Sequence, residues 1–191
     1  KELAKKHEVH VFTSDRKDGN IFKKEEVIDG IKIHRYKNWF RHKYYLTFTP
    51  GFLNILNYDL DILHVHSLGF LWHDKIVFLK KLFSRTKIIN TPHGPFMTLN
   101  NYGFFEDVFR KITVFFELFI NRLYDIVIQV NPNQWKWMIE YGISKDKIRY
   151  LPNGISESTF DKVNNKSFID KYKLKNKFVI SYLGEFKNIR G

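Results

Sequence analysis

The sequence contains no cysteine, so it holds neither a disulfide framework nor a thiolate metal site. It also has no long hydrophobic run. The longest apolar stretch, near residues 112–120, is interrupted by Thr113 and Glu117 and is too short to span a bilayer. No Gly-x-Gly-x-x-Gly motif occurs, which disfavours a dinucleotide-dependent oxidoreductase, although the expected place of that motif precedes residue 1. What remains is a chain of 191 residues whose hydrophobic content, 43%, is enough for a buried core.

Acidic residues are outnumbered by basic ones. The chain has 32 Lys and Arg against 20 Asp and Glu, a formal net charge of +12. Such a charge attracts phosphate groups on nucleotides, lipid head groups or nucleic acid. The alternative is an ordinary solvated surface from an organism whose proteins are rich in Lys and Asn.

Short apolar, β-branched runs alternate with longer helical patterns, which predicts βαβ units and a parallel sheet. We expect strands at 8–13, 25–28, 31–36, 61–66, 87–91, 125–130, 148–151 and 178–183. Asp29-Gly30 favours a tight hairpin turn between the second and third of them. Because the runs are almost continuously apolar, we expect helices on both faces of the sheet.

Helical spacing predicts helices at 74–83, 105–123, 133–140 and 167–172. In the second of these, Phe, Val, Ile and Leu side chains recur on one side, and we interpret that stripe as part of the core. The opposite side carries Glu106, Arg110, Thr113 and Glu117.

Neither end of the chain has the pattern of a natural domain end. Residues 1–6 resemble the last turns of a helix, and the sequence stops just after a strand-like run. We expect an N-terminal Rossmann-like domain at 1–152 that is incomplete at its start, a hinge or linker at 153–177, and the beginning of a second domain at 178–191. By itself the chain is expected to be inactive.

Five short motifs follow one another, each at the C-terminal end of a predicted strand or at the hinge. They are Asp61-Ile-Leu-His-Val-His-Ser67, Thr91-Pro-His-Gly94, Asp125-Ile-Val-Ile-Gln-Val-Asn131, Leu151-Pro-Asn-Gly-Ile155 and Tyr182-Leu-Gly-Glu-Phe-Lys-Asn-Ile-Arg-Gly191. In this order they resemble the family 4 retaining glycosyltransferases of GT-B architecture. The resemblance covers the whole chain.

The resemblance implies two Rossmann-like domains facing across a cleft. The N-terminal domain would hold the acceptor, and the C-terminal domain, which would begin at 178–191, would bind the nucleotide sugar. By that template the chain lacks the first strand with its Gly-rich loop and nearly all of the nucleotide-binding domain.

His93 is the candidate catalytic residue. Pro92 and Gly94 fix the backbone on either side of it, and ligands of open α/β sheets bind outside the carboxyl ends of strands. In the family, the matching histidine contacts the donor sugar, and Gly94 belongs to the same substrate-binding turn. The alternative role is a structural histidine that caps a turn.

Two further histidines, His64 and His66, are two residues apart on one strand and therefore point to the same face. This spacing suits zinc, but no third ligand lies nearby in sequence, so we expect no metal. We place His66 at the rim of the cleft as a substrate-binding residue. Asn131 either caps the following helix or lines the cleft.

The hinge and the C-terminal end carry the remaining candidates. Asn153-Gly154 matches the hinge turn of the family, where it approaches the donor, or is simply a turn that needs positive φ. Arg190 stands where the family has a lysine that binds the donor diphosphate, with Lys187 nearby. Glu185 departs from the family, which usually has an arginine there.

The resulting hypothesis is retaining transfer of a sugar, of the hexosyltransferase type, from a UDP- or GDP-sugar to a hydroxyl of a glycan or glycolipid. No metal or other cofactor is expected, because the family's positive groups stabilise the leaving diphosphate. Expected partners are the donor, the acceptor and an anionic membrane surface, which the aromatic and basic segment 36–45 would contact from the cytoplasm. A GT-B nucleotide-sugar epimerase, and a non-catalytic basic domain that binds membrane or nucleic acid, are the alternatives; nucleic acid is not an expected partner.

Overall fold

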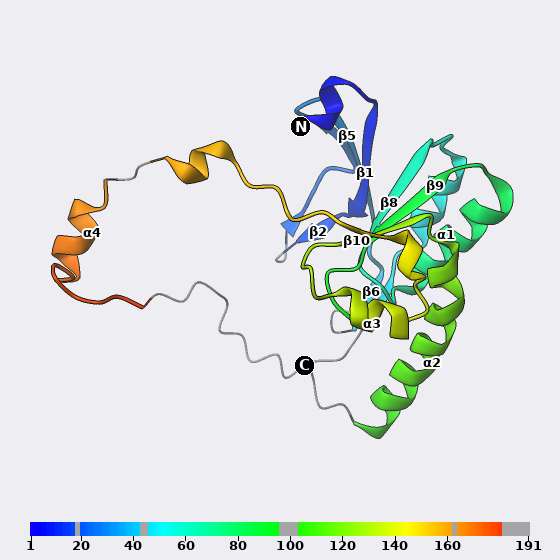
Figure 1. Ribbon diagram of the computed structural model, residues 1–191. Coiled ribbons are helices and arrows are strands. Elements are labelled where there is room, and N and C mark those ends of the chain that lie inside the picture. Colours follow the sequence, from blue (N-terminus) through cyan, green and yellow to red (C-terminus); the bar gives the residue numbers. More distant parts are fainter. Residues whose placement is uncertain (18–19, 43–45, 96–102, 162–163, 181–191) are drawn as a thin grey trace. The chain divides into compact units, whose positions relative to one another are not determined.

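The computed structural model describes residues 1–17, 20–42, 46–95, 103–161 and 164–180 (Figure 1). The chain divides into two compact units, Lys1–Pro152 and Asn153–Gly191. In the second unit the described elements are a short 3-10 helix, η5 (Glu157–Phe160), and α4 (Lys166–Lys171). Phe178–Ile180 form no strand, contrary to prediction, and the rest of that predicted strand lies outside the described residues. The assignment of 153–177 to a hinge or linker and of 178–191 to the beginning of a nucleotide-sugar-binding domain stays a prediction.

The first unit contains the predicted parallel sheet. Its strands are β8 (Ile62–His66), β9 (Lys87–Thr91), β10 (Ile126–Gln129) and β11 (Ile148–Tyr150), in the order β11-β10-β9-β8. Helices α1 (Leu71–Phe83), α2 (Phe104–Ile120) and α3 (Trp135–Glu140) connect them, with a 3-10 turn η3 (Asn121–Leu123) after α2. The core joins sheet and helices through Leu63, Val65, Ile76, Val77, Ile88, Val127 and Met138. The α/β fold with a parallel sheet flanked by helices is therefore confirmed.

A second sheet lies N-terminal to the first. In it β1 (Val9–Ser14) pairs parallel with β5 (Ile31–Tyr36), and β4 (Glu25–Ile28) pairs antiparallel with β5. The predicted turn at Asp29-Gly30 is confirmed, because both residues adopt the left-handed backbone, with φ of 52° and 79°. Among the described strands, no ladder joins this sheet to the four-stranded one.

Several short elements were not predicted from the sequence. They are the hairpins β2 (Arg16–Lys17) with β3 (Asn20–Ile21) and β6 (Phe40–His42) with β7 (Leu46–Phe48), and the 3-10 helices η2 (Pro50–Asn57) and η4 (Lys145–Lys147). Of these, η2 packs against β1, β5 and α1, and buries Ile55 in the core. The helical segment predicted at residues 1–6 is the short 3-10 helix η1 (Leu3–Lys5).

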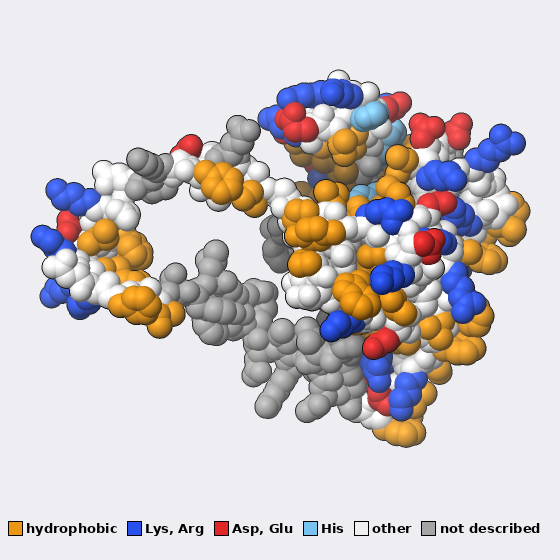
Figure 2. All heavy atoms as spheres, in the orientation of Figure 1, with side chains coloured by type: hydrophobic (Ala, Val, Ile, Leu, Met, Phe, Trp, Pro, Cys, Tyr) orange, Lys and Arg blue, Asp and Glu red, His pale blue; other side chains and the backbone are white. Residues whose placement is uncertain are grey.

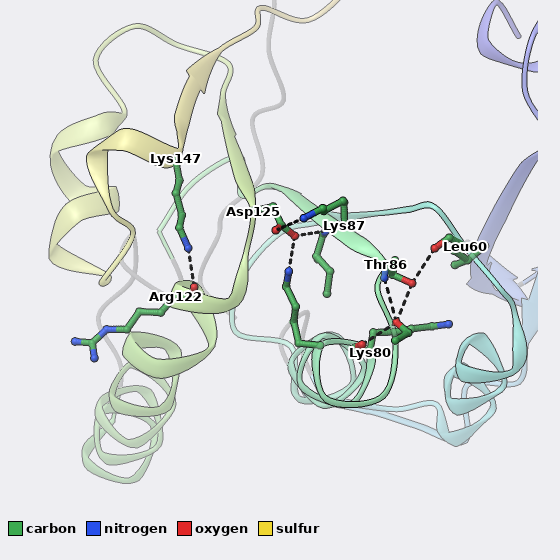
Figure 3. A network of polar contacts seen from close by, with 10 residues as sticks. Leu60, Lys80, Thr86, Lys87, Arg122, Asp125 and Lys147 are labelled. Atoms are coloured by element: carbon green, nitrogen blue, oxygen red, sulfur yellow. Dashed lines mark hydrogen bonds and ion pairs between the residues drawn. The ribbon is translucent and has the colours of Figure 1, made fainter.

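Asp125 ties the N-terminal ends of β9 and β10 to α1 (Figure 3). Its carboxylate accepts the backbone N–H of Ile88 at 2.7 Å and pairs with Lys81 at 2.6 Å and Lys87 at 3.7 Å. Burial opposes ionisation, but these donors prevail and lower the pKa of Asp125. The same figure shows Thr86 donating to the carbonyl of Leu60 at 2.8 Å, which fixes the loop ahead of β8.

The interpretation of the α2 stripe as core is wrong for most of its residues. Phe105, Ile112, Phe116 and Phe119 are more than half exposed, while Phe109, Ile120 and Leu123 do pack on the core. The opposite side of α2, which was expected to face solvent, is instead buried at Thr113 and Glu117. This buried side continues into Asn121. The reason is hydrogen bonding to the domain: Glu117 accepts a backbone N–H, and Asn121 donates to the carbonyl of Tyr141.

No described helix is both long and apolar enough to cross a membrane.

Candidate functional site

The candidate site lies at the C-terminal ends of β8, β9 and β10. The register places His66, the last residue of β8, beside Thr91, the last residue of β9. His66 Nδ1 lies 3.1 Å from His93 Nε2, and the two rings stack with centroids 5.4 Å apart. His64 stacks on His66 at 4.5 Å and contacts the Thr91 hydroxyl at 2.8 Å. Three imidazoles from two neighbouring strand ends thus form one row, which we call the histidine row.

The β8 strand shows why this row is accessible. Leu63 and Val65 are buried, whereas Ile62, His64 and His66 are exposed. The expectation that helices cover both faces of the sheet is therefore wrong at β8: its side chains alternate between core and surface, and the histidines occupy the surface side.

His93 holds an unusual backbone conformation. Its φ is 56°, in the left-handed region that costs a non-glycine residue free energy. The turn is tight, because Gly94 N–H donates to the carbonyl of Pro92 at 2.6 Å. Pro92 is fully buried and His93 is exposed, so the chain leaves the core within one residue. Strain of this kind is typical of functional turns, where it aims a side chain outward.

Gln134, which the sequence analysis did not select, connects the third strand end to this turn. Its side-chain amide donates to the carbonyl of His93 at 3.1 Å, and its oxygen accepts the N–H groups of Val130 and Asn131. A polar residue three positions after the predicted strand-end motif was the only signal available. Asn131 itself is exposed and accepts the N–H of Asn133 at 2.9 Å, so it organises the turn before α3, which begins at Trp135.

The turn that follows His66 is held by hydrogen bonds to β9 and α2. Ser67 and Gly69 have φ of 77° and 76°. Ser67 donates its N–H to the carbonyl of Thr91 at 2.9 Å and accepts a hydrogen bond from the Asn90 amide at 3.0 Å. Gly69 N–H donates to Glu117 Oε1 at 2.7 Å. Two buried elements, β9 and α2, therefore hold the segment that carries His66.

Glu117 has a carboxyl neighbour, Asp74 in the first turn of α1. Burial, then the charge of Glu117 and a hydrogen bond to it, raise the pKa of Asp74 to about 9. Burial also raises the pKa of Glu117. Both Asp74 Oδ1 and Glu117 Oε2 are buried, and no donor group of the described protein reaches either oxygen. The raised pKa of Asp74 keeps a proton at the pair at neutral pH, where Asp74 can donate it to Glu117.

His64 and His66 are adapted to hydrogen bonding rather than to positive charge. Burial, followed by the neighbouring histidines, lowers the pKa of His64, and burial followed by His93 lowers the pKa of His66. A neutral imidazole has one donor and one acceptor nitrogen, which suits the hydroxyl groups of a sugar. Burial also lowers the pKa of nearby His73 to about 4, and its Nδ1 is buried without a partner in the described protein.

Within the described ranges, no group of three or more His, Asp or Glu side chains is arranged to hold a metal ion. Asn153 and Gly154 begin the second unit, and Gly154 does not adopt positive φ. Glu185, Lys187 and Arg190 lie outside the described residues. Of the predicted site residues, the structure thus brings together His66, His93 and Gly94 and links them to the Asn131 turn through Gln134.

Known proteins resemble this chain in sequence and in fold. Residues 1–159 match Glycosyltransferase Family 4. An uncharacterized 41.2 kDa protein in the cps region of Klebsiella pneumoniae is 26% identical over 148 residues, which are 73% of this chain and 39% of that protein. The structure of sucrose-phosphate synthase from Thermosynechococcus elongatus superimposes with a TM-score of 0.62 and 14% identity, covering 91% of this chain and 44% of that one. The chain thus spans less than half the length of both proteins.

Proposed function

This chain belongs to glycosyltransferase family 4, and on that premise we propose that its whole protein transfers a sugar from a nucleotide-sugar donor to a hydroxyl acceptor. The chain would supply the acceptor side of the active site. The observation that carries the proposal is the contact between His66 and His93 at two adjacent strand ends, on a strained turn that exposes the His93 ring. Ligands of open α/β sheets bind at such strand ends.

The chemistry follows from what the row offers. Imidazole nitrogens form hydrogen bonds with sugar hydroxyls, so His93 and His66 would orient the donor sugar and the attacking hydroxyl. The departing diphosphate needs positive charge, which this basic chain and a helix N-terminus in the second domain would provide. Arg190 and Lys187 are our candidates for the diphosphate, and Asn153-Gly154 for the donor at the hinge. No metal is needed in this scheme.

The finer features of the reaction are also proposals. Family membership supports retention of anomeric configuration and a hexosyltransferase type with a UDP- or GDP-sugar donor. The relative in a cps region supports a cell-envelope polysaccharide, or its lipid-linked precursor, as acceptor. Such a protein would work in the cytoplasm at the inner face of the cell membrane.

Two other functions differ in what they require. A GT-B epimerase forms product from the donor alone, whereas a transferase requires an acceptor. A non-catalytic basic module binds anionic partners with steep salt dependence and is insensitive to changes at His93.

The test uses the whole protein with a panel of UDP-, GDP- and ADP-sugars and a glycan or membrane extract, and detects transfer by mass. His93→Ala removes the imidazole, and His93→Asn serves as its matched control because Asn tolerates the left-handed backbone and retains a donor and an acceptor. We expect His93→Ala to lower kcat/KM by about a hundredfold or more, with His93→Asn between the two. Gln134→Ala should lower kcat/KM less, because it only loosens the turn. Absence of transfer from every donor, or full activity of His93→Ala, would contradict the proposal.

A further inference from the structure

Helix α2 presents an apolar face to solvent. The seven side chains of this face, which we call the α2 outer face, are between 39% and 85% exposed: Phe104, Phe105, Val108, Ile112, Phe115, Phe116 and Phe119. Figure 2 shows hydrophobic side chains along the outer side of α2, with Lys and Arg side chains among them. A contiguous apolar surface of this kind in a protein marks a binding surface.

The inner side of the same helix shows that this exposure is not a by-product of packing. Phe109, Val114 and Ile120 pack partly buried on the core, but the buried positions, which continue into η3, are Thr113, Glu117 and Asn121, spaced four residues apart. Each is polar, and two of them bond to backbone groups of the domain. The most buried side chains of this helix are therefore polar, whereas most of its phenylalanines face outward.

The neighbouring helix α1 also exposes apolar side chains. α1 contacts α2, and its Phe78, Leu82 and Phe83 are 50%, 59% and 77% exposed. Apolar side chains on two adjacent helices provide more area than one helix face alone.

The charges around these apolar side chains are mainly positive. On α2 and just after it, the exposed cations are Lys111 and Arg122, whose guanidinium lies over the Phe119 ring at 5.9 Å. Figure 3 shows the Arg122 guanidinium pointing away from the Asp125 network. On α1, Lys75 and the following Arg85 are exposed. The acidic residues of α2 other than buried Glu117 are confined to its first turn, where Asp107 pairs with Arg110 and Lys111.

We propose that the α2 outer face binds an anionic lipid surface, with the helix lying parallel to the membrane and its phenylalanine rings at the level of the head groups. Phenylalanines flanked by Lys and Arg on an amphipathic helix are typical of interfacial membrane binding. A second copy of this chain is the less suitable partner, because a two-fold contact would bring the basic residues of the two copies together. The proposal concerns a surface other than segment 36–45 and does not depend on glycosyl transfer.

The experiment measures co-sedimentation of the whole protein with vesicles of phosphatidylcholine alone or mixed with phosphatidylglycerol, at low and high salt. The test variant is Phe115→Ser/Phe119→Ser. Two matched variants remove exposed aromatics elsewhere: Phe160→Ser in the second unit and Trp39→Ser in segment 36–45, which are 77% and 65% exposed in the parent. Thermal unfolding and light scattering without lipid accompany each variant.

We expect binding that needs the anionic lipid and weakens with salt, because the basic residues contribute through a screened attraction. The double variant should bind at least about tenfold more weakly, since two rings no longer leave water. Phe160→Ser and Trp39→Ser should bind like the parent.

Three results would overturn the proposal. Equal binding by parent and double variant, or a loss confined to Trp39→Ser, would assign membrane contact to another surface. A dimer without lipid that dissociates in the double variant would make the face an interface between copies. A clear fall of Tm in the double variant, without effect on vesicle binding, would show that another segment of the protein covers the face.

Discussion

The buried carboxyl pair of Asp74 and Glu117 makes the stability of the domain depend on pH in an unusual direction. Burial and the charge of Glu117 raise the pKa of Asp74 from 3.8 to about 9. Below about pH 4 the folded and unfolded states both hold this proton; between about pH 4 and pH 9 only the folded state does. The free energy of unfolding therefore falls as pH rises through this window, by up to about 1.4 kcal/mol per unit.

Replacing Asp74 with Asn tests this reasoning. The Asn amide can donate to the Glu117 carboxylate, as a protonated Asp74 can, but it does not titrate. From pH 5 to pH 8 the parent should lose up to about 4 kcal/mol through Asp74, whereas Asp74→Asn should lose little and be the more stable protein at pH 8. His73, whose pKa burial lowers from 6.5 to about 4, makes both proteins gain stability between about pH 5 and pH 6.5, so the comparison rests on the difference between parent and Asp74→Asn. Burial raises the pKa of Tyr124, which moves its titration above this range.

The assay is urea denaturation of the whole protein at pH 5, 6, 7 and 8, with Asp170→Asn on exposed α4 as the matched control. Protonation of Asp74 is also visible at pH 7 as the C=O stretching band of a carboxylic acid, which Asp74→Asn should remove from the infrared difference spectrum. Parallel pH dependences for parent and Asp74→Asn, with no such band, would refute a protonated Asp74.

Two further predictions concern stability. Gly142→Ala should destabilise the domain by about 1–3 kcal/mol, because Gly142 has φ of 80° and an added Cβ would lie 2.9 Å from the carbonyl oxygen of Leu118. Thermal unfolding measures this change in stability. The control Gly154→Ala, whose added Cβ would meet open space, should be almost neutral. Asp125→Asn should cost about 1 kcal/mol at pH 7 and progressively less as pH falls below 3.8, because the pKa of Asp125 is lowered in the folded state and its contribution disappears as pH falls through that lowered pKa. A cost that does not change with pH would show that the ion pairs are not responsible.

Local signals in the sequence predicted most of the fold. Alternating β-branched runs located the strands of both sheets to within a residue or two, and Asp29-Gly30 located a turn that needs positive φ at both positions. The motifs also placed His66 and His93 at the C-terminal ends of two strands, and the structure shows that these strands are neighbours.

What the sequence did not reveal depends on distant contacts. Periodicity shows which side of α2 is apolar, but not which side faces the domain, and here a hydrogen bond between Glu117 and Gly69, 48 residues apart, turns the polar side inward. The same holds for Gln134, whose partner is the carbonyl of His93, 41 residues away. Such orientations are fixed by tertiary hydrogen bonds that no local pattern encodes.

Because the two sheets are separate, the short helix η2 has the role of connecting them. Since no described strand of one sheet pairs with the other, backbone hydrogen bonds do not transmit unfolding between them. η2 contacts β1 and β5 of the N-terminal sheet and also α1, so its side chains, Ile55 above all, connect the N-terminal sheet to the four-stranded sheet and its helices. Weakening the η2 contacts would let the N-terminal sheet open while the histidine row stays folded. Amide hydrogen exchange would then show two groups of amides, one in each sheet, with different protection.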